Sequence, residues 1–371
     1  MKDFLKSVLP VFFSAVMLLL TCCASGKEVR KVLDDPEMVS CIRMGELEKV
    51  KKMIRTKEEA DSITKNGVPL IVLAAAEGKK DIAAYLLSCG ADVNGADAKK
   101  NTALHVAAGK DHLQIAALLL EKGANINIPG NYGKTPLMEA ARCGSGKCFA
   151  LLLEKGADIT IKDELGRTAL MHCCMGKKDQ VQMVKALLDR GAVREDSDSS
   201  GRMAVIYAAE KAHTESAKLL LDKYSDFSRD SLIGLAVMNG AIRGSDVKLA
   251  EYLLERKLPL NWDLFFSRQI LRRLSVRGAY RLMARNGLID AKRAPLLVAA
   301  KENNLPMVQF FISKGANILQ KDEKGYTAYD LATDRMVISY LKKVRNRKYK
   351  EMENESAGRT PPLFRGRVLG N

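Results

Sequence analysis

The chain has 371 residues, of which 47% are apolar and 6% aromatic, and it carries a formal net charge of +16. The apolar share excludes a disordered chain, because it supplies enough side chains for a substantial core. Eight cysteines are too few for a disulfide scaffold, and a single long apolar run, near the N-terminus, excludes a multi-span membrane protein.

Residues 1–25 are predicted to be a signal peptide. Two lysines precede the apolar run Val8–Leu20, which is too short to span about 30 Å of hydrocarbon as a helix. Cys22 and Cys23 follow in a context that resembles a bacterial lipobox, so they are lipidation candidates, and ordinary cleavage without lipid is the alternative. We therefore expect an exported chain that is periplasmic or membrane-anchored as a lipoprotein, with secretion as an open alternative.

A short motif then recurs at a fixed spacing. It reads PLIVLAA from 69, TALHVAA from 102, TPLMEAA from 135 and TALMHCC from 168. About twenty residues after each of the first three starts comes a second motif, a Leu pair followed by Gly-Ala-Asp or Gly-Ala-Asn. A constant period of about 33 residues is typical of proteins built from stacked, similar units.

Each motif position has a structural role. The Thr is a favoured N-cap residue, and Pro136 falls in the first helical turn, where a proline costs no hydrogen bond. The aliphatic pairs lie at helical spacing, and Gly123 and Gly156 follow them as C-cap glycines would. Each unit is therefore predicted to be a pair of helices, with a loop leading to the next pair.

These motifs resemble those of the ankyrin-repeat family, in which T-P-L-H-x-A recurs at this same period. The resemblance implies an all-α fold: one right-handed solenoid of helix-turn-helix units joined by hairpin-like loops, in place of the two or three domains that the length alone suggests. We expect this solenoid at residues 34–343, in roughly ten units that are degenerate at 36–65 and 261–291. A basic disordered tail is expected at 344–371.

The resemblance also implies a non-enzymatic scaffold that binds an unidentified protein partner on a concave surface made of hairpin tips and first helices. Exposed apolar residues there are the expected anchors, although simple exposure is the favoured alternative for any one tip residue. The candidate positions are Lys99, Asn101, Lys110, Asn131, Tyr132, Lys134, Arg142, Glu164, Leu165, Arg167 and Met175.

Neither catalysis nor a cofactor is expected. His105 occupies the histidine position of the motif, where the family uses the ring to hydrogen-bond loop backbone. No catalytic triad spacing, phosphate-binding loop or zinc-protease motif is readable, so no small-molecule substrate is predicted.

Four cysteines and a histidine fall in adjacent units: Cys143, Cys148, His172, Cys173 and Cys174. A zinc or disulfide site is one hypothesis, but the spacing matches no usual ligand pair. Cys173 and Cys174 stand at small-residue positions, where each most simply replaces a buried alanine. No metal site is therefore predicted.

The positive charge is concentrated in two stretches. Residues 264–293 hold eight Lys or Arg against one Asp, and residues 342–371 hold nine against three Glu. Arginines interleaved with leucines give the first stretch basic amphipathic helical character; the anionic-surface candidates are Arg268, Arg272, Arg273, Arg277, Arg281 and Arg285.

A solvated outer face of a degenerate repeat is the favoured explanation for this first stretch. Contact with anionic lipid or an acidic protein is the functional alternative. With the basic tail and an N-terminal lipid, it would make the chain an envelope-associated tether at an anionic membrane. Nucleic acid would suit the charge equally, but export removes the usual opportunity.

Overall fold

The computed structural model describes residues 32–33, 36–222, 231–256, 258, 294–322 and 324–357. The predicted signal peptide at 1–25, with Cys22 and Cys23, lies outside them, as do all six arginines of the anionic-surface prediction. The chain divides into two compact units, residues 1–164 and 165–371, and each is described by itself.

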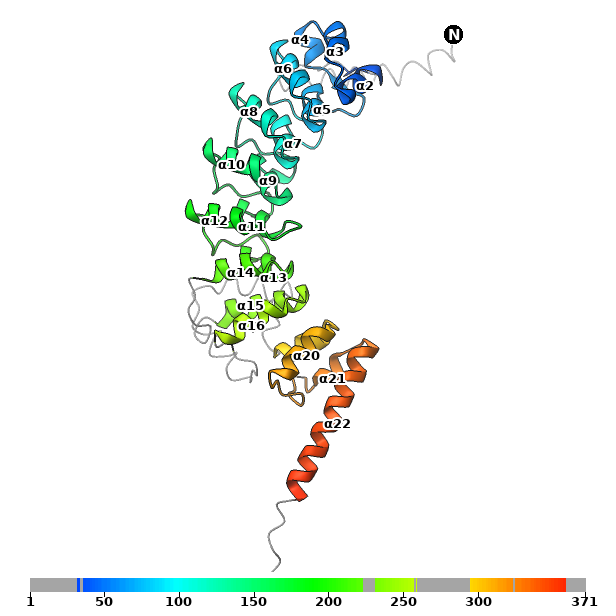
Figure 1. The fold of residues 1–371 in the computed structure, drawn as a ribbon, viewed down its shortest axis with the longest axis vertical. Coiled ribbons are helices and arrows are strands. Elements are labelled where there is room, and N and C mark those ends of the chain that lie inside the picture. Colours follow the sequence, from blue (N-terminus) through cyan, green and yellow to red (C-terminus); the bar gives the residue numbers. More distant parts are fainter. Residues whose placement is uncertain are drawn as a thin grey trace, which may run out of the picture. The chain divides into compact units, whose positions relative to one another are not determined.

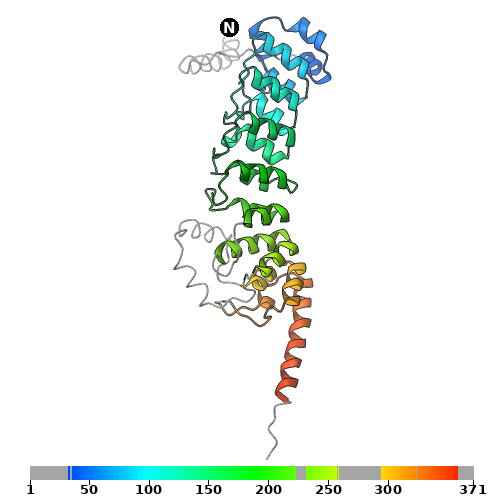
Figure 2. The same cartoon turned by 60° about the vertical axis from the view of Figure 1, so that its left-hand side comes forward.

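The first unit is a stack of helix pairs (Figure 1), in which first helices pack on first helices and second helices on second helices. Figure 2 shows the connecting loops along one side of these pairs. The first helices are α2 (Pro36–Met44), α5 (Leu70–Ala76), α7 (Ala103–Gly109) and α9 (Pro136–Cys143). The second helices are α3 (Leu47–Met53), α6 (Lys80–Ser88), α8 (Leu113–Glu121) and α10 (Gly146–Glu154).

Three short elements lie in the loops of this unit. These are helix α4 (Lys57–Ala60), the 3-10 helix η1 (Asn131–Gly133) and strand β2 (Ile63–Thr64). Strand β1 (Val32–Leu33), which comes before α2, pairs in parallel with β2, with Val32 opposite Ile63. The connection from the first pair to the second thus pairs with the segment that precedes the first pair.

The second unit repeats the arrangement of pairs. Its first helices are α11 (Ala169–Cys174), α13 (Ala204–Glu210), α15 (Ser231–Gly244), α19 (Pro295–Lys301) and α21 (Ala328–Leu331). Its second helices are α12 (Val181–Asp189), α14 (Thr214–Leu221), α16 (Val247–Glu255), α20 (Leu305–Ser313) and α22 (Arg335–Ala357). The predicted all-α repeat fold is therefore confirmed, since helices make up almost all the regular structure of the described residues.

Local sequence explains where these helices begin and end. In α9, the Thr135 hydroxyl accepts a hydrogen bond from the Met138 amide at 3.3 Å, and Pro136 occupies the first turn. The helix ends at Gly144, whose φ of 79° requires a residue without a Cβ penalty. The small residues of the motif form the core, because Ala140 and Ala141 are fully buried.

A residue with left-handed backbone separates the two helices of most pairs, and the spacing of these residues gives the repeat length. It falls at Gly45, Gly78, Asp111 and Gly144 in the first unit, and at Ala212, Ser245 and Asn303 in the second. The four positions of the first unit are evenly spaced, and the same interval separates Ala212 from Ser245. The step from Ser245 to Asn303 is 58 residues, 25 more than one repeat.

The pairs on either side of this long step are direct neighbours, because α15 contacts α19 and α16 contacts α20. The Asn304 side chain donates hydrogen bonds to the Ile242 carbonyl and, at 2.9 Å, to the Ser245 hydroxyl. Arg243 forms ion pairs with Glu210 of the preceding repeat, at 3.3 Å, and with Glu302 of the following one, at 3.8 Å.

The degenerate repeat expected at 261–291 lies outside the described residues and stays a prediction. The described residues form nine helix pairs, and the extra length falls between Leu258 and Ala294, where an ordinary hairpin loop would stand. Residues 259–293 themselves lie outside the described part of the chain. A helical periodicity identifies an amphipathic segment, but it does not identify the neighbour on which that segment packs.

Helix α22 also differs from the sequence-based prediction, which placed a disordered tail from residue 344. The prediction is wrong for residues 344–357, which continue the helix. This stretch contains no Gly or Pro, and pairs such as Lys348 with Glu351, 3.6 Å apart at i and i+3, favour helix. Residues 358–371 lie outside the described part of the chain.

Candidate functional site

In the first unit, the hairpin tips present the predicted binding residues at the turns between helix pairs. In the turn before α7, the Asp97 carboxylate accepts hydrogen bonds from the amides of Lys99, at 2.9 Å, and Asn101, at 2.8 Å. This fixes the turn and leaves Lys99 and Lys100 exposed, with Lys100 in the left-handed region at φ 64°. The half-buried Asn101 accepts a hydrogen bond from the Asn131 amide at 3.2 Å, which ties this tip to the next one.

Tyr132 is the most exposed of the predicted anchors. Its side chain is 61% exposed at the tip of η1, and its φ of 55° is unusual for an aromatic residue. The backbone holds it there, because the Tyr132 carbonyl accepts a hydrogen bond from the Glu164 amide at 3.0 Å. An exposed ring kept in a strained conformation is a candidate recognition feature, since strain of this kind concentrates at functional sites.

Lys134 and Arg142, two further predicted residues, are held by one carboxylate. Lys134 forms an ion pair with Glu139, and the side chains of both are nearly buried, while Arg142 lies 2.9 Å from the same carboxylate. Burial raises the pKa of the Glu139 carboxyl, but hydrogen bonds from Lys134 and Arg142 outweigh burial and leave that pKa below its usual value. Lys134 therefore supports the surface, whereas the exposed Arg142 can also reach a partner.

His105 joins successive hairpins, as the family resemblance implies. Its Nδ1 lies 3.0 Å from the Thr102 hydroxyl, and its Nε2 lies 2.9 Å from the Lys134 carbonyl. Burial lowers the pKa of His105, so the neutral ring is favoured. A Cβ at Gly130 would lie 2.6 Å from this ring, which explains a glycine at that loop position.

Lys110 lies at the C-terminal end of α7, as predicted. Its ammonium group donates to the Ala76 carbonyl of the preceding repeat at 2.8 Å, and its side chain is exposed. A cation at a helix C-terminus is favoured by the helix dipole. Lys110 thus joins two repeats while its side chain stays exposed.

In the second unit, the predicted residues differ in exposure. Leu165 is 47% exposed, and its carbonyl accepts a hydrogen bond from the Ser199 amide at 2.9 Å. Arg167 and Met175 are half-buried, the latter at the C-cap of α11. Leu165 is therefore a more accessible apolar anchor than Met175. Tyr326, which sequence reasoning overlooked, is also 47% exposed at a tip, directly before the N-cap Thr of α21.

The cysteine and histidine residues form no metal site in the part of the chain that the structure describes, where no three potential ligands gather. Cys148, Cys173 and Cys174 are buried free thiols, and Cys143 is an exposed one. Burial raises the pKa of Cys148 to about 12 and raises those of Cys173 and Cys174 as well. These buried thiols are therefore protonated and unreactive near neutral pH.

None of the described helices is long and apolar enough to cross a membrane. Helix α22 instead displays positive charge: from Lys342 to Lys350 the sequence has six Lys or Arg and no acidic residue. Most of these side chains are exposed, and Arg345 stacks on the ring of Tyr329 at 4.1 Å.

Comparison with protein families agrees with the repeat geometry. The family described as "Ankyrin repeats (3 copies)" matches residues 37–129, 72–163 and 161–231, and the family "Ankyrin repeat" matches residues 292–323. Ankyrin repeats are generally protein–protein interaction modules, and proteins built from them are typically non-enzymatic.

Proposed function

We propose a function for this chain on one premise: it belongs to the ankyrin-repeat family. It is an exported, non-enzymatic scaffold that binds a protein partner through its hairpin tips and the exposed side of its first helices. The observation that carries this proposal is the pair of exposed apolar tip residues, Tyr132 and Leu165, each held in place by a backbone hydrogen bond. Large apolar residues fixed at loop tips are typical anchors of protein interfaces.

Export is supported by the sequence of residues 1–25, and Cys22 or Cys23 would carry the lipid of an anchored form. Detergent phase partitioning of the cellular protein tests the lipid. If the lipoprotein proposal is correct, replacing both cysteines by serine moves the protein to the aqueous phase. Unchanged partitioning rules lipidation out.

The scaffold proposal is tested by affinity capture with the mature chain. We expect the combined substitutions Tyr132→Ser and Leu165→Ser to reduce recovery of the captured partner at least tenfold. Leu113→Ser is the matched control, because Leu113 is a 37% exposed leucine at the start of the second helix α8, away from the tips. If the tip variant recovers the partner as well as the parent chain does, the tips are not the binding surface.

A membrane tether is the second candidate function, and helix α22 favours it. Six exposed or half-exposed cations between Lys342 and Lys350 suit an anionic lipid surface, where each Lys or Arg contributes about 1 kcal/mol. The chain should then sediment with vesicles containing phosphatidylglycerol, and less so after reversal of charge at Lys342, Lys343 and Arg347. The same reversal at Arg272, Arg273 and Arg277 tests the other basic stretch. An absence of sedimentation at low salt would leave the scaffold alone.

A further inference from the structure

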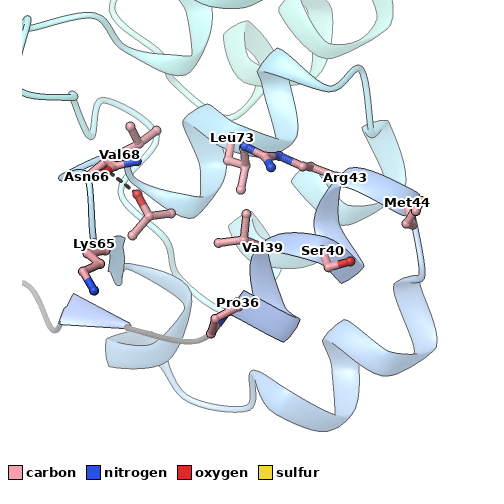
Figure 3. A pocket seen from close by; sticks show the side chains of 10 residues that line it. Pro36, Val39, Ser40, Arg43, Met44, Lys65, Asn66, Val68 and Leu73 are labelled. Atoms are coloured by element: carbon pink, nitrogen blue, oxygen red, sulfur yellow. Dashed lines mark hydrogen bonds between the residues drawn. The ribbon is translucent and has the colours of Figure 1, made fainter.

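A surface cavity lies between the first helix pair and the second. It has a volume of about 580 Å³ and lies between α2, α5 and the hairpin that joins the first two pairs (Figure 3). A volume of this size is within the range of ligand-binding pockets. We call it the N-terminal groove; its lining consists of Pro36, Val39, Ser40, Arg43, Met44, Thr64, Lys65, Asn66, Val68 and Leu73.

A small side chain on α2 contributes to the space. The left-handed residues Gly45 and Gly78 set the register between the first two repeats, so Ser40 corresponds to Leu73, one repeat later. Leu73 is only 8% exposed, whereas Ser40 is exposed. The first repeat therefore lacks the aliphatic side chain that the second one packs at this position.

The groove combines an apolar interior with a positive rim. In Figure 3 the side chains of Val39, Val68 and Leu73 surround the space, and those of Arg43 and Lys65 lie on opposite sides of it. None of its ten lining residues is acidic.

The two cations of the rim are accessible. Lys65 is exposed, and the Arg43 side chain is 62% exposed, with Nε 3.7 Å from the Glu77 carboxylate. An ion pair this long and exposed contributes little, so Arg43 can also reach a second carboxylate. Met44, which is 73% exposed, extends the apolar surface beyond the groove.

Exposed positive charge also occurs at the hairpin tips and first-helix ends of the first unit. Residues 36–164 are almost neutral, with 18 Lys or Arg and 17 Asp or Glu. Yet the tip and helix-end positions after the groove present the exposed cations Lys99, Lys100 and Lys110, against Glu77 and Glu164. The binding side therefore carries more positive than negative charge, and this favours a partner of opposite sign.

We propose that the N-terminal groove binds an acidic peptide segment of the protein partner, with one bulky aliphatic or aromatic side chain inserted between Val39 and Leu73. Carboxylates that flank this side chain contact Arg43 and Lys65. The inference rests on the proposed scaffold function and deepens it, because it names the chemistry of the segment that the scaffold recognises.

The decisive variant is Ser40→Leu, which narrows the groove with the residue that the next repeat carries at the corresponding position. The substitution removes no charge, and Ser40 is exposed, so the variant should remain folded with an unchanged or raised melting temperature. The matched control is Ser88→Leu, which adds the same side chain at an exposed position of the second helix α6.

The probe is a displayed library of random dodecapeptides, selected on the full chain and counter-selected on Ser40→Leu. We expect the enriched peptides to carry an excess of Asp and Glu around one Leu, Ile, Met or Phe. A synthetic peptide from this set should bind at least tenfold more weakly to Ser40→Leu, two- to fivefold more weakly to Arg43→Gln, and equally to Ser88→Leu. Raising the salt concentration should weaken binding further.

The inference is overturned if no peptide distinguishes the chain from Ser40→Leu, or if the enriched peptides show no acidic excess. Its failure is separable from that of the scaffold function. If partner capture depends on Tyr132 and Leu165 but is unaffected by Ser40→Leu, the scaffold remains and the groove is not its binding site. If neither change affects capture, both proposals fail.

Discussion

Replacing residues 259–293 by an ordinary hairpin should leave the repeat stack intact. The replacement is the loop 92–101, which connects Ala91 to Thr102 as the longer segment connects Leu258 to Ala294. The two ends are equivalent: the Leu258 amide donates to the Leu253 carbonyl at 3.1 Å, and the Ala91 amide donates to the Leu86 carbonyl at 3.0 Å. The contacts of α15 with α19 need no residue of the segment.

The magnitude follows from loop-closure entropy, which grows as (3/2)RT ln n. Shortening the connection from about 35 to about 10 residues should raise the free energy of unfolding by about 1 kcal/mol. The denaturant slope in urea should not fall, because the described contacts across the junction bury the same surface in both chains. Urea titrations followed by far-ultraviolet circular dichroism measure both quantities.

Deletion of residues 103–135, one complete repeat, is the matched control, and it should lower both the slope and the stability. If the shortened chain instead loses slope as this control does, and is destabilised by more than about 2 kcal/mol, residues 259–293 bury substantial surface. The reasoning from the contacts of α15 with α19 would then be refuted.

Three further predictions concern single side chains of the first unit. Tyr132→Asn should raise the free energy of unfolding by up to about 1 kcal/mol, because Asn tolerates left-handed backbone better than Tyr does. The same substitution should weaken partner capture. A lower free energy of unfolding would show that the backbone at Tyr132 is not strained. Glu139→Gln should lower the melting temperature at pH 7, where the carboxylate holds Lys134. Because folding lowers the pKa of Glu139, the stabilisation by its carboxylate is present above the unfolded pKa of about 4.3 and is lost as pH falls through the folded pKa. The melting temperatures of the two chains should therefore converge near pH 3. A difference that stays constant with pH would contradict this. Maleimide at pH 7 should label the exposed Cys143 in the native chain and should label Cys148 only after denaturation. Mass spectrometry of tryptic peptides measures both. Labelling of Cys148 in the native chain would contradict its burial.

Sequence predicted the repeat fold well because the features that specify it are local. Thr135 and Pro136 mark a helix start without reference to any distant residue, and the contact of His105 with the next loop follows from its place in the motif. The exposed positions of Tyr132 and Leu165 agree with their assignment to hairpin tips, although their role in binding stays a prediction.

What sequence did not reveal depends on which segments are neighbours. The direct contact of α15 with α19 could not be predicted, because a long stretch of chain separates these two helices in the sequence. The N-terminal groove was missed because residues of α2, α5 and the hairpin between them form it together, and no motif marks such an arrangement.

The long step between Ser245 and Asn303 also has a mechanical consequence. When a chain is pulled from its ends, each regular repeat that unravels releases the length of one repeat, whereas detachment at this junction releases the additional chain of the long step as well. Fully extended, that additional chain of about 25 residues adds about 80–90 Å to the contour length. Under tension the array would therefore lengthen unevenly, with one large step among smaller ones, and that step would mark the α15–α19 junction in a single-molecule force trace.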